Sequence, residues 1–203
     1  MSERLKNRDY YLAVDKSGSM ETADTSSGQS RFKYAEESTI ALAKKLESFD
    51  PDGICVIPFG SSHKVYDNVT ADKVADIFKE NQPFGGTNLA PVLKHCFDDY
   101  LKKKKAGTCP ENGAIVVVMT DGAPSDPAEV KKAIVDFTQK LDNGDGEFGI
   151  LFLQVGKDSG AGNYLRELDD NLKGAKFDIV DAKTFDEVES LGILGALEAS
   201  LDD

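Results

Sequence analysis

Short apolar runs alternate with longer segments of helical periodicity along most of the chain. Runs that are mostly apolar predict strands at residues 10–14, 54–59, 64–66, 114–119, 148–155 and 177–180. Segments with apolar residues three and four positions apart predict helices at residues 31–48, 70–80, 88–104, 127–141, 163–172 and 184–200. This alternation indicates a mostly parallel sheet with helices on both faces.

Local turn and cap signals punctuate the chain without dividing it into separate parts. Thr70 and Asp126 occupy positions where helix N-caps are expected, and residues 21–30 are small and polar, which is typical of a loop. The sequence contains no internal repeat and no low-complexity linker. We therefore expect one domain over residues 1–203. Its class is α/β, with a doubly wound, mostly parallel sheet and one short antiparallel edge strand at 64–66.

Composition and charge exclude several classes of function. The 203 residues carry a net charge of -12, whereas nucleic-acid binding needs a basic surface, so no nucleic-acid partner is expected. No run of about 18 apolar residues is present, so no membrane span is expected, and residues 1–9 lack the apolar core of a signal peptide. Cys55 and Cys96 fall in apolar patterns and are expected to be buried thiols, which fits a reducing compartment. We therefore expect a cytoplasmic location.

Oxygen-bearing side chains follow two of the predicted strands at the point where each strand ends. Asp15, Ser17 and Ser19 come directly after the first strand, and Asp121 follows the strand at 114–119. Ligands of an open parallel sheet bind beyond the carboxyl ends of its strands, where the strand order reverses. If these two strands are neighbours, both carboxylates meet in one crevice, and the Gly-Gly turn before Thr87 can bring in a further hydroxyl.

The chemistry of these groups points to a metal, although simpler interpretations stay open. Hard oxygen ligands suit Mg²⁺, Mn²⁺ or Ca²⁺. Ser17 and Ser19 would also serve as ordinary helix caps, and Asp121 with Gly122 would also form an ordinary turn.

The complete set of residues resembles the metal-ion-dependent adhesion site of the von Willebrand factor type A family. The matching pattern is Asp15-x-Ser17-x-Ser19, then Thr87, then Asp121 within Thr-Asp-Gly. The similarity covers residues 9–200, roughly the whole core, and the stretches around the motif are similar to the family's intracellular bacterial branch. Some members of that branch sit in tellurium-resistance and stress operons.

The resemblance implies a Rossmann-like fold and a role for each residue of the site. Ser17 and Ser19 would bind the metal directly, Thr87 directly or through water, and Asp15 and Asp121 mostly through water or hydrogen bonds. Neutral hydroxyls cancel little of the ion's charge, so Mg²⁺, or Mn²⁺ or Ca²⁺, would attract one more anion. The predicted function is a metal-dependent protein-interaction module, not an enzyme, whose partner protein supplies an Asp or Glu.

Two alternatives compete with this interpretation. The first is a Mg²⁺-dependent hydrolase acting on phosphoesters, because a strand-end Asp beside a metal also occurs in phosphoryl-transfer enzymes. Against it, position 17 is Ser where such enzymes often have an acid, and no phosphate-binding loop motif is present. The second is a metal site that only stabilises the fold, although serine ligands would make such a site weak.

Two further segments are expected to lie near the site or respond to it. The loop at 21–30 follows Ser19 and should overhang the metal, either as a passive insertion or as a rim that selects the partner. The predicted helix at 184–200 contains Gly192 and Gly195, which weaken it. The resemblance implies that this last helix shifts when the metal shell changes.

Overall fold

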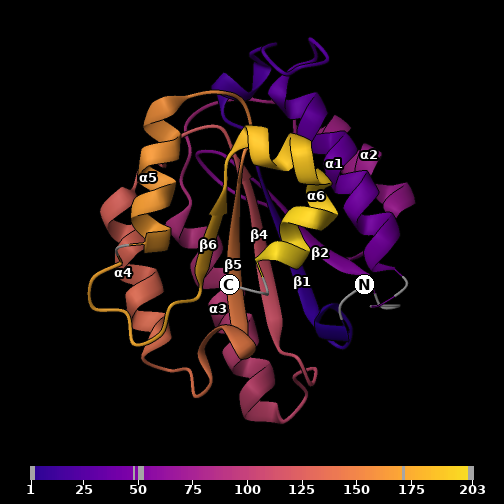
Figure 1. Ribbon diagram of the computed structural model, residues 1–203. Coiled ribbons are helices and arrows are strands. Elements are labelled where there is room, and N and C mark those ends of the chain that lie inside the picture. Colours follow the sequence, from indigo (N-terminus) through magenta and orange to yellow (C-terminus); the bar gives the residue numbers. More distant parts are fainter. Residues whose placement is uncertain (1–2, 48, 50–52, 171, 201–203) are drawn as a thin grey trace.

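A six-stranded sheet forms the middle layer of the fold (Figure 1). The computed structural model describes residues 3–47, 49, 53–170 and 172–200. The strands are β1 (Asp9–Asp15), β2 (Ile54–Phe59), β3 (Tyr66–Val69), β4 (Ala114–Thr120), β5 (Phe148–Gln154) and β6 (Val180–Lys183). Their spatial order is β3-β2-β1-β4-β5-β6, and β3 alone among these neighbours runs antiparallel to its partner. The predicted fold class is confirmed.

Helices cover both faces of this sheet, as Figure 1 shows. They are α1 (Arg31–Leu46), α2 (Ala71–Glu80), α3 (Ala90–Ala106), α4 (Pro127–Thr138), α5 (Ser159–Asp170) and α6 (Phe185–Ala199). Buried side chains of α1, α2 and α6 belong to one apolar cluster, and those of α3, α4 and α5 belong to a second. Short 3-10 helices occur at Glu3–Leu5, Gly18–Glu21 and Gly144–Gly146.

The central strand β4 shows how the sequence produces two cores. Successive side chains of a strand point to opposite faces, so a strand covered on both sides is apolar at every position. The whole of β4 is buried. Its side chains alternate between the α1 side (Ile115, Val117 and Met119) and the α3 side (Ala114, Val116 and Val118).

The edges of the sheet differ from the sequence prediction. The strand predicted at 64–66 lies at Tyr66–Val69, because Tyr66 pairs with Val56 and Val69 with Ile54 across an irregular antiparallel ladder. The strand predicted at 177–180 lies at Val180–Lys183. There Phe177 contacts Gly144 instead of extending the ladder. Apolar character alone therefore placed both edge strands a few residues too early.

Helix ends also differ from the prediction. The helix predicted at 127–141 ends at Thr138, and the one predicted at 163–172 begins earlier, at Ser159. The helix predicted at 88–104 runs from Ala90 to Ala106. Residue 48, the last position of the helix predicted at 31–48, lies outside the described residues. So does residue 171, in the helix predicted at 163–172. The last helix is kinked at Gly192, whose φ of 70° and ψ of 159° are not helical.

The two cysteines that were predicted to be buried differ in their exposure. Cys96 on α3 is buried, as predicted, and burial raises the pKa of its thiol. Cys55, also predicted to be buried, is only partly buried because it lies on β2 next to the short edge strand, and burial still raises the pKa of its thiol. Both thiols are free of disulfides.

None of the described helices combines the length and the apolar character needed to cross a membrane.

Asp126 binds a different helix from the one it was expected to cap. It stands at the N-cap position of α4, but its side chain makes no cap bond there. Its Oδ1 accepts from the backbone N–H of Leu89 (3.0 Å), and its Oδ2 accepts from the N–H of Ala90 (2.8 Å). These donors belong to the beginning of α3, where backbone N–H groups lack partners within the helix. One carboxylate thus joins the starts of two helices.

We expect Asp126→Ala to lower the free energy of unfolding by about 1–2 kcal/mol, because two backbone N–H groups lose their acceptor. Urea denaturation followed by circular dichroism measures this change. Asp126→Asn keeps one good acceptor and should lose less. A variant Asp126→Ala as stable as the wild type would contradict this role.

Candidate metal centre

The site lies where the strand order of the sheet reverses. Strands β2 and β3 lie on one side of β1 within the sheet, and strands β4, β5 and β6 lie on its other side. β1 and β4 are neighbours, and their carboxyl ends lie at the upper edge of the sheet in Figure 1. Asp15 is the last residue of β1, and Asp121 follows the last residue of β4. The expected meeting of the two strand ends is confirmed.

Asp15 connects the ends of the two strands at this edge of the sheet. Its side chain is fully buried. Oδ1 accepts from the backbone N–H of Ser17 (2.7 Å), and Oδ2 accepts from the Thr120 hydroxyl (2.7 Å). Burial raises the pKa of Asp15 to about 6, against the opposing effect of these hydrogen bonds. The carboxylate therefore ties the end of β1 to its own following turn and to the end of β4.

Ser17, Ser19 and Asp121 form a continuous chain of oxygen atoms. The Oγ atoms of Ser17 and Ser19 are 3.1 Å apart, and the Ser19 hydroxyl donates to Oδ1 of Asp121 (3.0 Å). Ser17 and Asp121 are buried, whereas Ser19 is exposed. The chain of oxygens thus leads from the interior to the surface at Ser19.

Thr87 belongs to a loop that is bonded to both of the other turns. Its N–H donates to the Ser125 hydroxyl (3.2 Å), and its carbonyl accepts from the Ser125 N–H (2.7 Å). In the same loop, the carbonyl of Gly85 accepts from the N–H of Gly18 (3.1 Å). The loop therefore lies beside the turn between Ser17 and Ser19. Direct contact of the Thr87 hydroxyl with a metal stays a prediction.

Gly85 is required for this approach. Its φ of +82° lies in the left-handed region, and a Cβ there would lie 2.6 Å from Oγ of Ser61. That hydroxyl accepts from the N–H of Gly86 (3.0 Å), which fixes the turn before Thr87. The Gly-Gly turn before Thr87 therefore depends on a left-handed backbone at Gly85.

Arg31 is a part of the site that the sequence reasoning missed. It is the first residue of α1. Its Nη1 donates to Oδ2 of Asp121 (2.8 Å), while Nε and Nη2 donate to the two carboxylate oxygens of Asp24 (2.8 and 2.5 Å). The hydrogen bond from Arg31 lowers the pKa of Asp24, and the two carboxylates raise the pKa of Arg31. A cation at a helix N-terminus opposes the helix dipole, and this signal was available in the sequence.

The donor set fits a hard divalent cation. Within the described residues, no three His, Cys, Asp or Glu side chains gather in a way that would hold a metal. The oxygens that converge here are instead three hydroxyls, of Ser17, Ser19 and Thr120, and two carboxylates, whose oxygens already accept hydrogen bonds from the chain. Such a set offers Ser17 and Ser19 as neutral ligands, which suits Mg²⁺ or Mn²⁺ with several waters retained.

Comparison with known sequences identifies a family. The sequence profile of the von Willebrand factor type A domain matches residues 10–123, a range that contains all five predicted site residues. No curated protein matches the chain.

Several solved structures share the fold. A mutant of the PilB minor pilin from Streptococcus sanguinis is 14% identical, with a TM-score of 0.69 over 97% of this chain and 62% of the pilin. The manganese-loaded TRAP protein of Plasmodium vivax is 16% identical, with a TM-score of 0.63 over 97% of this chain and 74% of that one. Proximal thread matrix protein 1 from the mussel byssus is 18% identical, with a TM-score of 0.60 over 96% of this chain and 48% of that one. This chain thus spans less than two thirds of the pilin and of the byssus protein.

We expect Thr120→Val to lower the free energy of unfolding by about 1–3 kcal/mol, because the buried Asp15 carboxylate loses a donor. Urea denaturation in the presence of chelator isolates this contribution from any metal. Thr120→Ser retains the donor and is the matched control, with less than half the loss. Equal stability of Thr120→Val and the wild type would show that this bond does not hold Asp15.

Proposed function

The chain belongs to the von Willebrand factor type A domain family, and from this premise we propose that it is a protein-interaction module that binds a partner's carboxylate through a divalent metal ion. The proposed metal residues are Asp15, Ser17, Ser19, Thr87 and Asp121. The observation that carries the proposal is the hydrogen-bonded group of hydroxyls and carboxylates at the junction of β1 and β4.

The arrangement of hydrogen bonds supports a division of roles within the site. Both oxygens of Asp15 accept bonds from the chain, and so do both oxygens of Asp121. These carboxylates orient the turn and the Ser19 hydroxyl, and they act on a metal mainly from its outer shell. The hydroxyls of Ser17 and Ser19 are then the direct ligands. When bound, the ion supplies an under-neutralised positive charge that attracts an Asp or Glu side chain from outside.

An exposed aromatic side chain beside the site supports a protein as the partner. Phe84 is 82% exposed, although apolar residues of this size are usually buried. Its backbone N–H donates to the carbonyl of Lys16 (2.7 Å), the residue between Asp15 and Ser17. Aromatic side chains, phenylalanine included, are enriched in the buried core of protein interfaces.

The hydrolase alternative has less support. A metal-dependent hydrolase needs a group that accepts a proton from the attacking water. At this site both carboxylates already accept hydrogen bonds at each oxygen, and position 17 is a serine. Metal-dependent hydrolysis of a generic phosphoester that Asp15→Ala abolishes would favour the hydrolase. We therefore propose that the protein is not an enzyme.

The wider biological setting stays a prediction. Resemblance of the stretches around Asp15, Thr87 and Asp121 to the family's intracellular bacterial branch is the basis for a role in stress or tellurium resistance. The proposed cytoplasmic location rests on the thiols of Cys55 and Cys96, which form no disulfide.

We expect the purified protein to bind Mn²⁺ or Mg²⁺ in calorimetric titrations, and Ser17→Ala to weaken this binding about tenfold or more through loss of a ligand. Manganese is a suitable probe because a structure of the same fold is manganese-loaded. Ser62→Ala, which removes an exposed hydroxyl from the loop after β2, is the matched control and should bind as the wild type does. No uptake of either ion at millimolar concentration would reject the proposal.

Partner binding should depend on both the ion and Phe84. A partner can be identified as a protein that the wild-type bait captures with Mg²⁺ but that the Ser17→Ala bait does not. We expect the purified partner to bind about tenfold more weakly to Phe84→Ala, because truncation of an interface anchor costs that much. The Mn²⁺ affinity of Phe84→Ala should be unchanged. Undiminished affinity of the partner in excess chelator would contradict the metal bridge.

A further inference from the structure

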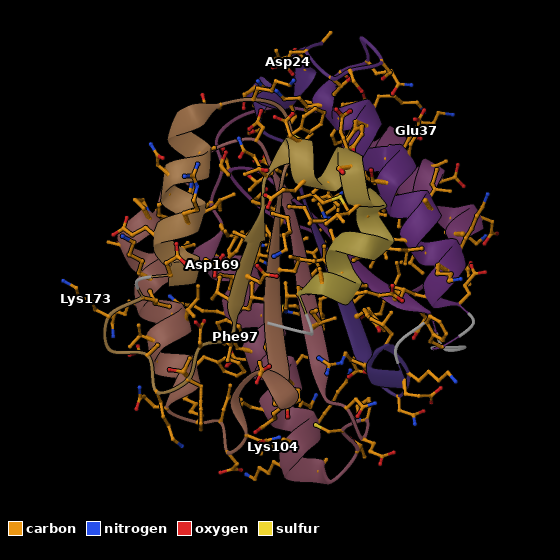
Figure 2. The ribbon with its side chains drawn as sticks, in the orientation of Figure 1. Asp24, Glu37, Phe97, Lys104, Asp169 and Lys173 are labelled. Atoms are coloured by element: carbon orange, nitrogen blue, oxygen red, sulfur yellow. The ribbon has the colours of Figure 1, made fainter. Side chains whose placement is uncertain are left out.

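One guanidinium group bridges the proposed metal centre and the loop of residues 22–30. Arg31 donates to Asp121 on one side and to both oxygens of Asp24 on the other. Asp24 lies within that loop, which Figure 2 shows above the carboxyl ends of the strands. The backbone N–H of Arg31 also donates to the carbonyl of Thr22 (2.9 Å), which closes the base of the loop.

The surroundings of Arg31 are built to hold it in this position. Its side chain is 11% exposed. Gly156, which follows β5 with a φ of +80°, lies directly against the guanidinium, because a Cβ there would come within 2.3 Å of Nε and 2.8 Å of Cζ. Any residue larger than glycine would therefore displace the arginine. The helix dipole disfavours a cation at this helix start, so stability of α1 does not explain the residue.

The bridge changes the charge available to a metal. Oδ1 of Asp121 accepts from Ser19, and its Oδ2 accepts from Arg31, so each oxygen already has a hydrogen-bond partner that competes with direct coordination. The guanidinium charge is only two hydrogen bonds away from the Ser19 hydroxyl. Charges of like sign this close repel even at an effective dielectric constant typical of protein surfaces. Arg31 thus lowers the attraction of the site for a cation and raises its attraction for an anion.

We propose that Arg31 is a positioning residue that tunes the metal centre and couples it to the loop of residues 22–30. It holds Asp121 in the outer shell, so that the ion stays poorly neutralised and available to a partner's carboxylate. Through Asp24 it orders the loop that overhangs the site. This inference rests on the proposed function, since it assumes that the site binds a divalent cation.

Calorimetric titration of Arg31→Gln with Mn²⁺ tests the charge effect. We expect Mn²⁺ to bind about three to ten times more tightly than to the wild type, because a repelling charge is removed and Asp121 is released. Lys33→Gln is the matched control: it removes the same charge from an exposed position two residues along α1, and should leave the affinity unchanged. Arg31→Lys retains the charge, so its affinity for Mn²⁺ should be closer to that of the wild type than the affinity of Arg31→Gln is. Tighter binding is diagnostic, because a loosened fold would weaken binding.

Hydrogen exchange in chelator tests the tether without any metal. The N–H groups of Thr22 and Gly28 donate to backbone carbonyls of Ser19 and Thr25, so their exchange reports order in the loop. Arg31→Gln and Asp24→Asn should both speed their exchange about tenfold, since both break the same bridge, whereas Lys33→Gln should not.

The outcomes separate this inference from the proposed function. If the wild type binds Mn²⁺ and Arg31→Gln binds it equally or more weakly, the tuning role is wrong and the metal-dependent module stands. If the wild type does not bind Mn²⁺, the proposed function and the tuning role both fail. Unchanged exchange at Thr22 and Gly28 in both bridge variants would overturn the coupling to the loop.

Discussion

The burial of one carboxylate at the carboxyl end of the central strand β1 is the constraint on which the site depends. Removing an ionised carboxylate from water costs free energy unless hydrogen bonds replace its hydration. Asp15 meets this requirement with the Ser17 N–H on one oxygen and the Thr120 hydroxyl on the other. These bonds fix the turn after β1 against the end of β4. The positions of the neighbouring hydroxyls follow from that junction.

The same constraint explains why the site offers hydroxyls instead of charges. The carboxylates of Asp15 and Asp121 are buried and accept hydrogen bonds from the protein itself, so the exposed oxygen of the group, the Ser19 hydroxyl, is neutral. A divalent ion held by neutral oxygens keeps most of its charge and attracts an anion from outside. In the proposed tuning role, Arg31 adds to this effect through its hydrogen bond to Oδ2 of Asp121. The exposed ring of Phe84 provides apolar area next to the same point. Together these features favour an adhesion-type site over a catalytic one.

Much of the fold and the proposed site could be predicted from the sequence because both depend on local patterns. The continuous apolar run of β4 marked a strand covered on both faces, and strand-end positions placed Asp15 and Asp121 at the same edge. The edge strands β3 and β6 were misplaced because their pairing register, not their hydrophobicity, sets their limits.

The contacts that the sequence did not reveal are those between segments distant along the chain. Asp126 was expected to cap α4 but binds the start of α3, which only the packing of two helices side by side makes reachable. The bridge from Arg31 to Asp121 spans 90 positions and needs Gly156 from a third segment. No spacing rule relates such residues, although a cation at a helix start was a local sign of an unusual environment.

The most direct test of the metal-dependent account is a crystal structure grown with Mn²⁺, in which anomalous scattering locates the ion. The account predicts a Mn²⁺ ion within about 2.5 Å of the hydroxyls of Ser17 and Ser19, with the Arg31 bridge to Asp121 intact. A crystal grown in millimolar Mn²⁺ that shows no ion at this position would contradict the account. An ion held by the two carboxylates and by neither hydroxyl would contradict it as well.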